Sequence, residues 1–428
     1  MTARDRPIRV VHVITRLILG GAQENTLYTA IGQHRNPVFD VTLVIGSDDG
    51  TEGSLREQAQ AAGLRVVEIP SLVRPIRPLT DAVALWRLYR LFRQEQFEIV
   101  HTHSSKAGIL GRIAARVARV PVVVHTLHSL VFHEYQSPVK NGVYIALKRL
   151  CAPMTDVLIS VNDKTTAGAL ARHIGRPQQY LTIHTGMHLD AFLSVGDSLD
   201  LEEAKRRLGI PARAPVVGKI ARLFPLKGHQ QFFDAAGEIA MRRPDVHFLL
   251  VGDGPLRADL ETRADKLGIL NRTHFIGRVL PDQVPACIQA MDVVVHTSLR
   301  EGIARVLPQA GAVGKPVVTF ALDGAPEVIE DGVTGYLVPP LDTAALAARV
   351  IELLANPALR ERFGQAGRRV SAEHFQIDHM VDRINAVYFD LLARHAIAIP
   401  AIPLDPFHSL TGETSAQDPR RRERPAVP

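Results

Sequence analysis

Short apolar runs alternate along the first half of the chain with longer stretches in which apolar residues recur every three or four positions. The runs are rich in β-branched residues, which favours strands, and the longer stretches have the period of amphipathic helices. This alternation predicts βα units and a parallel sheet covered by helices. The predicted strands are residues 8–15, 39–45, 66–69, 98–102, 122–126, 157–161 and 180–183.

The same alternation starts again after a polar, Pro-containing junction. Strands are predicted at residues 215–220, 247–251, 274–276, 293–295 and 316–320, and helices at 342–355, 357–374 and 378–394. Because 428 residues are too many for one core, two domains are expected. The predicted division is a first domain at 1–190, a linker at 191–214 with one short charged helix, a second domain at 215–374, a last helix at 375–395 and a disordered Pro- and Arg-rich tail at 396–428.

The stretch from Thr297 to Gly335 carries the densest pattern of polar loops at predicted strand ends. Glu301-Gly302 follows one strand and precedes an apolar periodic segment, and the Gly-containing loop 323–327 follows the next strand. Loops at the carboxyl ends of parallel strands form a crevice into which backbone N–H groups and helix N-termini point. This crevice suits a phosphate-bearing ligand, with Glu301 at its lip.

Arg222 and Lys227 flank a tight loop that follows the strand 215–220. Two cations at a strand end can converge on a diphosphate. The alternative is that both are ordinary solvated surface residues.

Charge and composition limit the possible ligands and the cellular compartment of the protein. The chain has 50 Lys+Arg against 44 Asp+Glu and a net charge of +6, which suits an anionic substrate or a membrane surface and does not by itself indicate nucleic acid. Cys151 and Cys287 show no metal-ligand spacing and fit a reduced cytosolic compartment. We find neither the apolar segment of a signal peptide nor an apolar run of bilayer length, and expect a cytoplasmic protein that is soluble or lies at a membrane surface.

Two segments bear on membrane contact. The predicted helix 81–96 carries Arg87, Arg90 and Arg93 between apolar residues, and it is either an ordinary domain helix or an interfacial helix that contacts anionic lipid. The arginines near residue 420 are in the predicted disordered tail, where they are either solvated or touch acidic lipid.

Glycines and histidines follow several strands of the first domain. Gly20-Gly21 allows close approach of a ligand to the backbone, but no G-x-G-x-x-G fingerprint of a dinucleotide fold is present. The histidines at two strand ends could form a metal site, yet no carboxylate or cysteine lies at ligand spacing. We therefore expect no metal and favour a functional polar role for His128. The histidines concerned are His101, His103, His125 and His128.

Together these elements resemble glycosyltransferase family 4, a retaining group with the GT-B fold of two facing Rossmann-like domains. The likeness extends from about Val10 to Leu392 and rests on eight motifs in the family's order. They are Gly20-Gly21, the strand ends at 100–104 and 125–128, Gly218 to Arg222 with Lys227-Gly228, 250–255, 275–277, Glu301-Gly302 and 335–338. The resemblance implies parallel sheets and a C-terminal helix that crosses back to the first domain.

It also implies a first domain that binds the acceptor and a second that binds a nucleotide diphospho-sugar, with no cofactor. By position, Arg222 and Lys227 would neutralise the leaving diphosphate, Glu301 would hold the donor sugar, and His128 would lie near that sugar. The remaining donor-binding residues implied are Gly20, Gly21, Gly252, Gly254, Gly277, Val279, Gly302, Ile303, Ala304, Arg305 and Gln309. Gln309 departs from the family, which has a second glutamate there, but an amide can still hydrogen-bond a ribose.

The implied activity is transfer of a sugar with retention of anomeric configuration to a glycan or lipid-linked acceptor, as in bacterial surface polysaccharide synthesis. No Asp-x-Asp triplet is present, which agrees with cations in place of a divalent metal. Two alternatives remain open: a nucleotide-sugar epimerase or hydrolase on the same fold, and a non-catalytic nucleotide-sugar-binding scaffold. A nicotinamide dehydrogenase is not indicated, because its fingerprint is absent.

Overall fold

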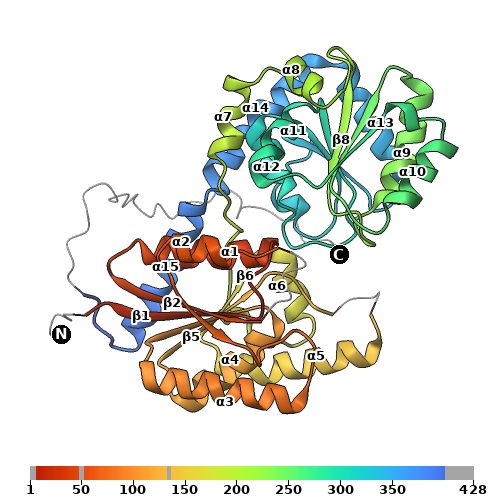
Figure 1. The fold of residues 1–428 in the computed structure, drawn as a ribbon. Coiled ribbons are helices and arrows are strands. Elements are labelled where there is room, and N and C mark those ends of the chain that lie inside the picture. The colour runs from red at the N-terminus through yellow and green to blue at the C-terminus, as the bar shows by residue number, and fades with distance from the viewer. Residues whose placement is uncertain (1–5, 48–52, 133–135, 401–428) are drawn as a thin grey trace, which may run out of the picture.

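The computed structural model describes residues 6–47, 53–132 and 136–400, and Figure 1 shows its two lobes, each built on a sheet. Seven parallel strands form the first sheet in the order β3-β2-β1-β4-β5-β6-β7. Their bounds are β1 Ile8–Ile14, β2 Phe39–Gly46, β3 Arg65–Ile69, β4 Ile99–His103, β5 Val122–Leu127, β6 Val157–Ser160 and β7 Tyr180–Thr182.

Helices cover both faces of the first sheet, so its strands are apolar on both sides. Along β1, Val10 and Ile14 face the core shared with α1 and α15, whereas Val11 and Val13 face the core shared with α3 and α4. The helices of this lobe are α1 Gly21–His34, α2 Arg56–Ala61, α3 Pro78–Glu95, α4 Ser105–Ala118, α5 Pro138–Cys151 and α6 Asp163–Leu170.

The second sheet has six parallel strands in the order β10-β9-β8-β11-β12-β13. Its strands are β8 Val216–Ile220, β9 His247–Val251, β10 Thr273–Gly277, β11 Val293–His296, β12 Val317–Phe320 and β13 Gly335–Val338. Its helices are α9 His229–Arg242, α10 Arg257–Lys266, α11 Val284–Gln289, α12 Val306–Val313, α13 Thr343–Ala355 and α14 Pro357–His374. Two facing parallel α/β lobes confirm the predicted fold class.

The segment expected to be a linker contains α7 Asp190–Ser198 and α8 Leu201–Arg207, although the sequence predicted a single helix there. Phe192, Val195 and Ala204 from these helices lie in the core of the second lobe. The apolar residues of α7 explain this packing, because they cover α11 and α12.

The last helix, α15 Ile377–Arg394, returns to the first lobe as predicted, and Figure 1 shows it beside α1. Its side chains Met380, Ile384 and Tyr388 are buried in the first lobe's core. The chain therefore crosses between lobes twice, and the two crossings lie side by side: the Met187 N–H donates to the Phe375 carbonyl at 2.8 Å.

Among the described residues, no helix combines the length and the hydropathy required to cross a bilayer. Cys151 and Cys287 are both buried and unpaired. Residues 401–428, which include the arginine-rich part of the predicted tail, lie outside the described residues.

Candidate active site

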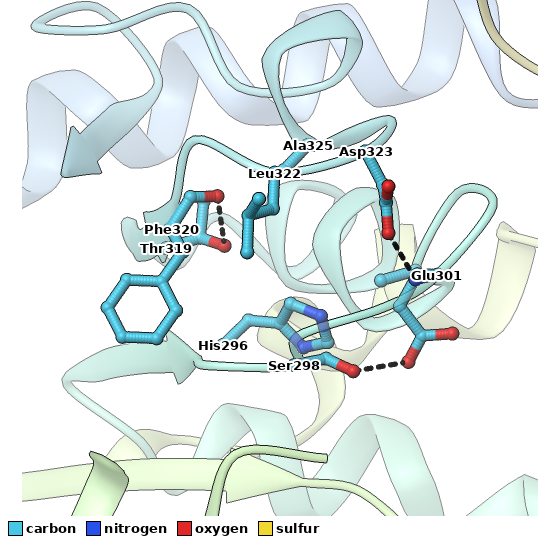
Figure 2. A pocket seen from close by; sticks show the side chains of 9 residues that line it. His296, Ser298, Glu301, Thr319, Phe320, Leu322, Asp323 and Ala325 are labelled. Atoms are coloured by element: carbon cyan, nitrogen blue, oxygen red, sulfur yellow. Dashed lines mark hydrogen bonds between the residues drawn. The ribbon is translucent and has the colours of Figure 1, made fainter. Parts of the chain in front are cut away.

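Glu301 lies in the loop between β11 and α12, and three neighbouring groups fix it. Its backbone N–H donates to Asp323 Oδ2 at 2.6 Å, and its Oε1 accepts from the Ser298 hydroxyl at 3.0 Å, as Figure 2 shows. The same carboxylate oxygen lies 2.5 Å from Lys227 Nζ. Burial raises the pKa of Asp323, although the N–H of Glu301 opposes that shift. Both side chains of the Glu301–Lys227 ion pair are about three-quarters buried.

The loop that carries Lys227 packs directly on the Glu301 loop. Leu226 and Gly228 both have left-handed backbone conformations, and a Cβ on Gly228 would lie only 1.7 Å from the Thr297 carbonyl oxygen. The Leu299 N–H donates to the Leu226 carbonyl at 2.9 Å. Only glycine permits this approach, which brings Lys227 beside Glu301.

Lys219 on β8 lies beneath this pair. Its Nζ donates to Thr297 Oγ1 at 2.7 Å, and its side chain is 1% exposed. Burial, together with the positive charge of Lys227, lowers the pKa of Lys219 to about 7. Lys219 was not predicted as a site residue, because a lysine within a strand pattern does not reveal which face of the sheet it occupies.

The first lobe reaches this loop from the other side. A Cβ on Gly302 would lie 2.2 Å from the carbonyl oxygen of His128, so the two lobes touch at the backbone. Arg305 forms an ion pair with Glu24, which lies in the first turn of α1, the helix that begins at Gly21. Glu327 accepts from the Asp163 N–H at 2.8 Å and so caps α6 of the first lobe. These contacts join the two lobes directly.

A cleft of about 360 Å³ lies where the two lobes meet. It brings together seven of the predicted site residues: Gly21, His128, Lys227, Glu301, Gly302, Ile303 and Arg305. Neighbours that the sequence did not indicate complete the lining, namely Ala22, Ser129, Val161, Thr185, Pro225, Leu226 and Arg300. Their participation depends on how the lobes face each other, which local sequence patterns do not encode.

Other predicted residues lie outside this lining. Arg222 is exposed, and its guanidinium lies over the Phe224 ring at 5.1 Å. Ala304 lines a small cavity behind Glu301, beside His296, whose buried Nδ1 has no hydrogen-bond partner among the described residues (Figure 2). The remaining residues that do not line the cleft are Gly20, Gly252, Gly254, Gly277, Val279 and Gln309.

Two of these glycines have a clear packing reason. A Cβ on Gly252 would lie 2.0 Å from the Ala221 carbonyl oxygen, and one on Gly254 would lie 2.5 Å from that of Leu223. The Gly252 N–H also donates to the Gly277 carbonyl at 2.8 Å. These glycines bring the loops after β8, β9 and β10 into contact at one edge of the second sheet.

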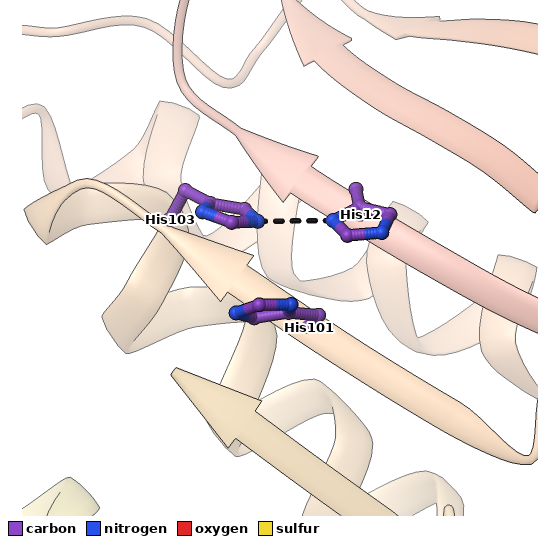
Figure 3. Close-up of side chains that lie close together, drawn as sticks. All are labelled: His12, His101 and His103. Atoms are coloured by element: carbon purple, nitrogen blue, oxygen red, sulfur yellow. Dashed lines mark hydrogen bonds between the residues drawn. The ribbon is translucent and has the colours of Figure 1, made fainter. Parts of the chain in front are cut away.

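The histidines do not form the group that their spacing suggested. His101, His103 and also His12 lie on the α1 and α15 side of the first sheet, where Figure 3 shows them together. His125 faces the opposite side and hydrogen-bonds Thr102 on β4. Alternation along β5 explains this separation. Among the described residues, His12, His101 and His103 are the one set whose donor atoms lie close enough to hold a metal ion.

Comparison with known proteins decides the family. The model of the glycosyl transferase 4-like domain matches residues 20–186, and that of the glycosyl transferases group 1 matches residues 200–370. The D-inositol 3-phosphate glycosyltransferase of Salinispora arenicola is 30% identical over 322 residues, which are 70% of this chain and 70% of that protein. This chain belongs to glycosyltransferase family 4.

Two further comparisons cover most of this chain and almost all of the other protein. An Escherichia coli UDP-Gal:α-D-GlcNAc-diphosphoundecaprenol α-1,3-galactosyltransferase is 29% identical over 92% of this chain and 99% of its own length. The crystal structure of Anabaena HepE in complex with UDP and glucose has a TM-score of 0.75 at 23% identity, covering 89% of this chain and 99% of HepE. The first supports the transferase class over the epimerase and scaffold alternatives, and the second shows the same fold.

Proposed function

We propose that this transferase moves a sugar from a UDP-sugar to a lipid-linked glycan acceptor, with retention of configuration and without a metal ion. The observation that carries the proposal is the Lys227–Glu301 pair, which lines the interlobe cleft together with His128. Similarity to the E. coli galactosyltransferase over nearly its full length supports the donor and acceptor classes. Similarity to HepE supports a fold able to hold UDP.

The main chemical requirement of the transfer is stabilisation of the negative charge on the leaving group. As the bond between the anomeric carbon and the diphosphate oxygen breaks, negative charge grows on the phosphate, and Lys227 supplies a fixed cation there. Arg222, from the same loop, would turn from Phe224 towards the phosphate. The absence of an Asp-x-Asp triplet supports these cations in the role that a divalent ion has in other transferases.

The acceptor hydroxyl attacks the anomeric carbon from the face that the diphosphate leaves, and its proton passes to the departing phosphate oxygen. In this scheme Glu301 and His128 hold the donor sugar, and Gly302 to Arg305 bind sugar and phosphate. Arg305 must then exchange its Glu24 partner for the ligand. The loops Gly252 to Pro255 and Gly277 to Val279 would surround the nucleotide base, and Gln309 would bind the ribose.

Contact with the inner face of the cell membrane would deliver a lipid-linked acceptor. On α3, Leu79 is 86% exposed and Trp86 is 55% exposed, and Arg90 lies over the Trp86 ring. An apolar stripe flanked by arginines is the pattern of a helix that lies at an anionic lipid surface.

A thermal-shift panel with UDP, GDP, ADP and their common sugars tests donor binding. At a hundred times its dissociation constant, a ligand that binds only the folded protein stabilises it by about 2.7 kcal/mol. We expect UDP to shift the wild type more than the Lys227→Ala variant. If no nucleotide shifts the wild type, the donor class is wrong.

Transfer itself is then measured with a UDP-sugar and a polyprenyl-diphosphate sugar, and NMR of the product reads the anomeric configuration. We expect Lys227→Ala to slow transfer about 10²- to 10³-fold, by analogy with removal of one donor to a developing anion. A variant with half of the wild-type rate at saturating donor would exclude this role for Lys227. Inversion of the anomer, or activity abolished by EDTA, would contradict the proposed mechanism.

A further inference from the structure

A chain of buried hydrogen bonds runs from the crossover helix α15 to the cleft. Asn385 Oδ1 accepts from Gln33 Nε2 at 3.0 Å, and Gln33 Oε1 lies 2.7 Å from His12 Nε2. His12 Nδ1 lies 3.0 Å from His103 Nε2, and His103 Nδ1 lies 3.2 Å from His128 Nε2. The chain thus ends at the one histidine of the set that lines the cleft.

These side chains meet because of strand periodicity. His12 on β1 and His103 on β4 point to the sheet face that α1 and α15 cover, and Figure 3 shows the bond between their rings. Both histidines and Gln33 are at most 1% exposed. Water therefore cannot supply alternative partners, and each ring nitrogen must use its protein neighbour.

Gln33 determines which atom donates in each hydrogen bond of this chain. Its amide N–H donates to Asn385 Oδ1, which leaves the oxygen Oε1 for His12. An amide oxygen only accepts, so the proton of His12 is on Nε2, and Nδ1 accepts from His103 Nε2–H. The same rule puts the His128 proton on Nε2. Burial lowers the pKa of His12 and of His128 to about 4 and that of His103 well below its usual range, so each ring carries one proton.

We propose that Gln33, His12 and His103 are positioning residues, which fix His128 as a neutral ring with its proton on Nε2. This inference rests on the proposed function in so far as His128 contacts the donor sugar. With Nε2–H committed to His103, the ring can serve a sugar hydroxyl only as an acceptor, through Nδ1. A disordered tautomer would present a donor half of the time and weaken that contact.

A metal ion is the competing use of these histidines. His12 and His103 have both ring nitrogens in hydrogen bonds, and His101 bonds Tyr388 at 2.6 Å and Thr126 at 2.7 Å. An ion at the cluster would have to replace several of these bonds. The test below therefore includes metal removal.

The direct test is NMR of the full-length protein labelled with ¹⁵N-histidine, which distinguishes Nδ1–H from Nε2–H tautomers, with the His128 signal assigned from His128→Asn. Gln33→Leu breaks the hydrogen-bond chain at a residue that His12 and His103 separate from His128. Thr29→Val is the matched control, because Thr29 is buried one turn earlier on α1 and its hydroxyl, within the described part of the chain, bonds only the Asn25 carbonyl.

We expect an Nε2–H His128 in the wild type and in Thr29→Val, and a mixture of tautomers in Gln33→Leu. The kcat/KM for the donor should fall about tenfold in Gln33→Leu alone, the effect typical of a lost partner behind a functional histidine. An Nδ1–H ring, a His128 signal unchanged by Gln33→Leu, or a signal that shifts on dialysis against EDTA would each overturn the relay. The NMR measurement needs no substrate, so an absence of transfer would count against the proposed function only.

Discussion

At the scale of single residues, Glu301 is held by groups from three separate loops. Lys227 comes from the loop after β8, Ser298 from the loop after β11, and Asp323 from the loop after β12. Each loop follows a strand of one parallel sheet, so the strand ends converge on one carboxylate. The sequence predicted Glu301 and Lys227 as site residues, but not that they would pair.

Removal of the Glu301 charge tests whether this carboxylate contacts the donor sugar or the phosphate. We expect Glu301→Gln to lower turnover by at least tenfold, because the carboxylate addresses the donor sugar. Affinity for free UDP should be unchanged or higher, since Lys227 no longer has to leave an ion pair to meet the phosphate. Calorimetry of UDP binding beside a rate assay checks both parts. Equal losses in UDP binding and turnover would assign Glu301 to the phosphate.

Some residues were predictable from their type and position in a motif, and others were not. Gly228 and Gly302 were predicted as part of glycine loops, and the structure supplies the reason, since a Cβ at either would collide with a backbone carbonyl. Asp323 was recognised only as part of a loop, because its contact with Glu301 depends on the register between β11 and β12. Glu24 was missed because its partner Arg305 belongs to the other lobe.

At the scale of elements, strands β1, β4 and β5 carry buried histidines whose pKa values burial lowers. Folding lowers the pKa of His12 on β1, and of His128 just after β5, from 6.5 to about 4, so the unfolded chain binds more protons between these pH values. Their contribution to stability is complete above pH 6.5 and is lost as the pH falls towards 4.

Urea unfolding at steps from pH 7.5 to pH 4.5 checks this expectation. The free energy of unfolding should fall by about 1.4 kcal/mol per pH unit for each histidine that titrates only in the unfolded chain. His125→Gln should reduce the slope of the unfolding free energy against pH by the contribution of one histidine, since burial also lowers the pKa of His125. A flat profile between pH 6.5 and pH 5 would show that the histidines are not held neutral.

Helix α3 offers a second prediction at this scale. Its outer stripe of Leu79, Val83 and Trp86 is exposed, and Trp86 is the single tryptophan of the chain. With vesicles that contain phosphatidylglycerol we expect binding and a blue shift of Trp86 fluorescence, both weaker with neutral lipid. Leu79→Glu should reduce binding, whereas Met241→Glu on α9, at an 80% exposed residue of the other lobe, should not. Equal binding to both kinds of vesicle would exclude an electrostatic surface contact.

The sequence predicted the alternation of strands and helices well, because strands buried on both faces form continuous apolar runs. It did not predict α5, although the segment has the apolar period of an amphipathic helix. It also missed α7, because this short helix ends in Gly196-Asp197-Ser198, a sequence typical of a junction between domains.

At the scale of the whole molecule, α15 completes the core of the first lobe although it follows the second lobe in sequence. Seven of its side chains are buried there: Ile377, Met380, Val381, Ile384, Tyr388, Leu391 and Leu392. At roughly 1.5–3 kcal/mol for each buried side chain, their burial contributes as much as the whole net stability of a typical domain.

A chain that ends after residue 376 should therefore lose the fold of its first lobe and keep that of its second. We expect strong binding of a hydrophobic dye and rapid proteolysis within residues 6–186. A chain that ends after residue 400 is the control, and it should melt like the full-length protein. If the shorter chain also melts normally, the first lobe is stable without α15.

The position of α15 in the chain also constrains the order of events during synthesis. The ribosome completes the first sheet early, but the helix that closes its core follows about 200 residues later, roughly 10 to 40 s at ordinary elongation rates. During that interval the second lobe can finish folding, whereas the first exposes the apolar side of its sheet. The lobe made first is thus the lobe finished last, and a chaperone would be needed most at the N-terminal half of the nascent chain.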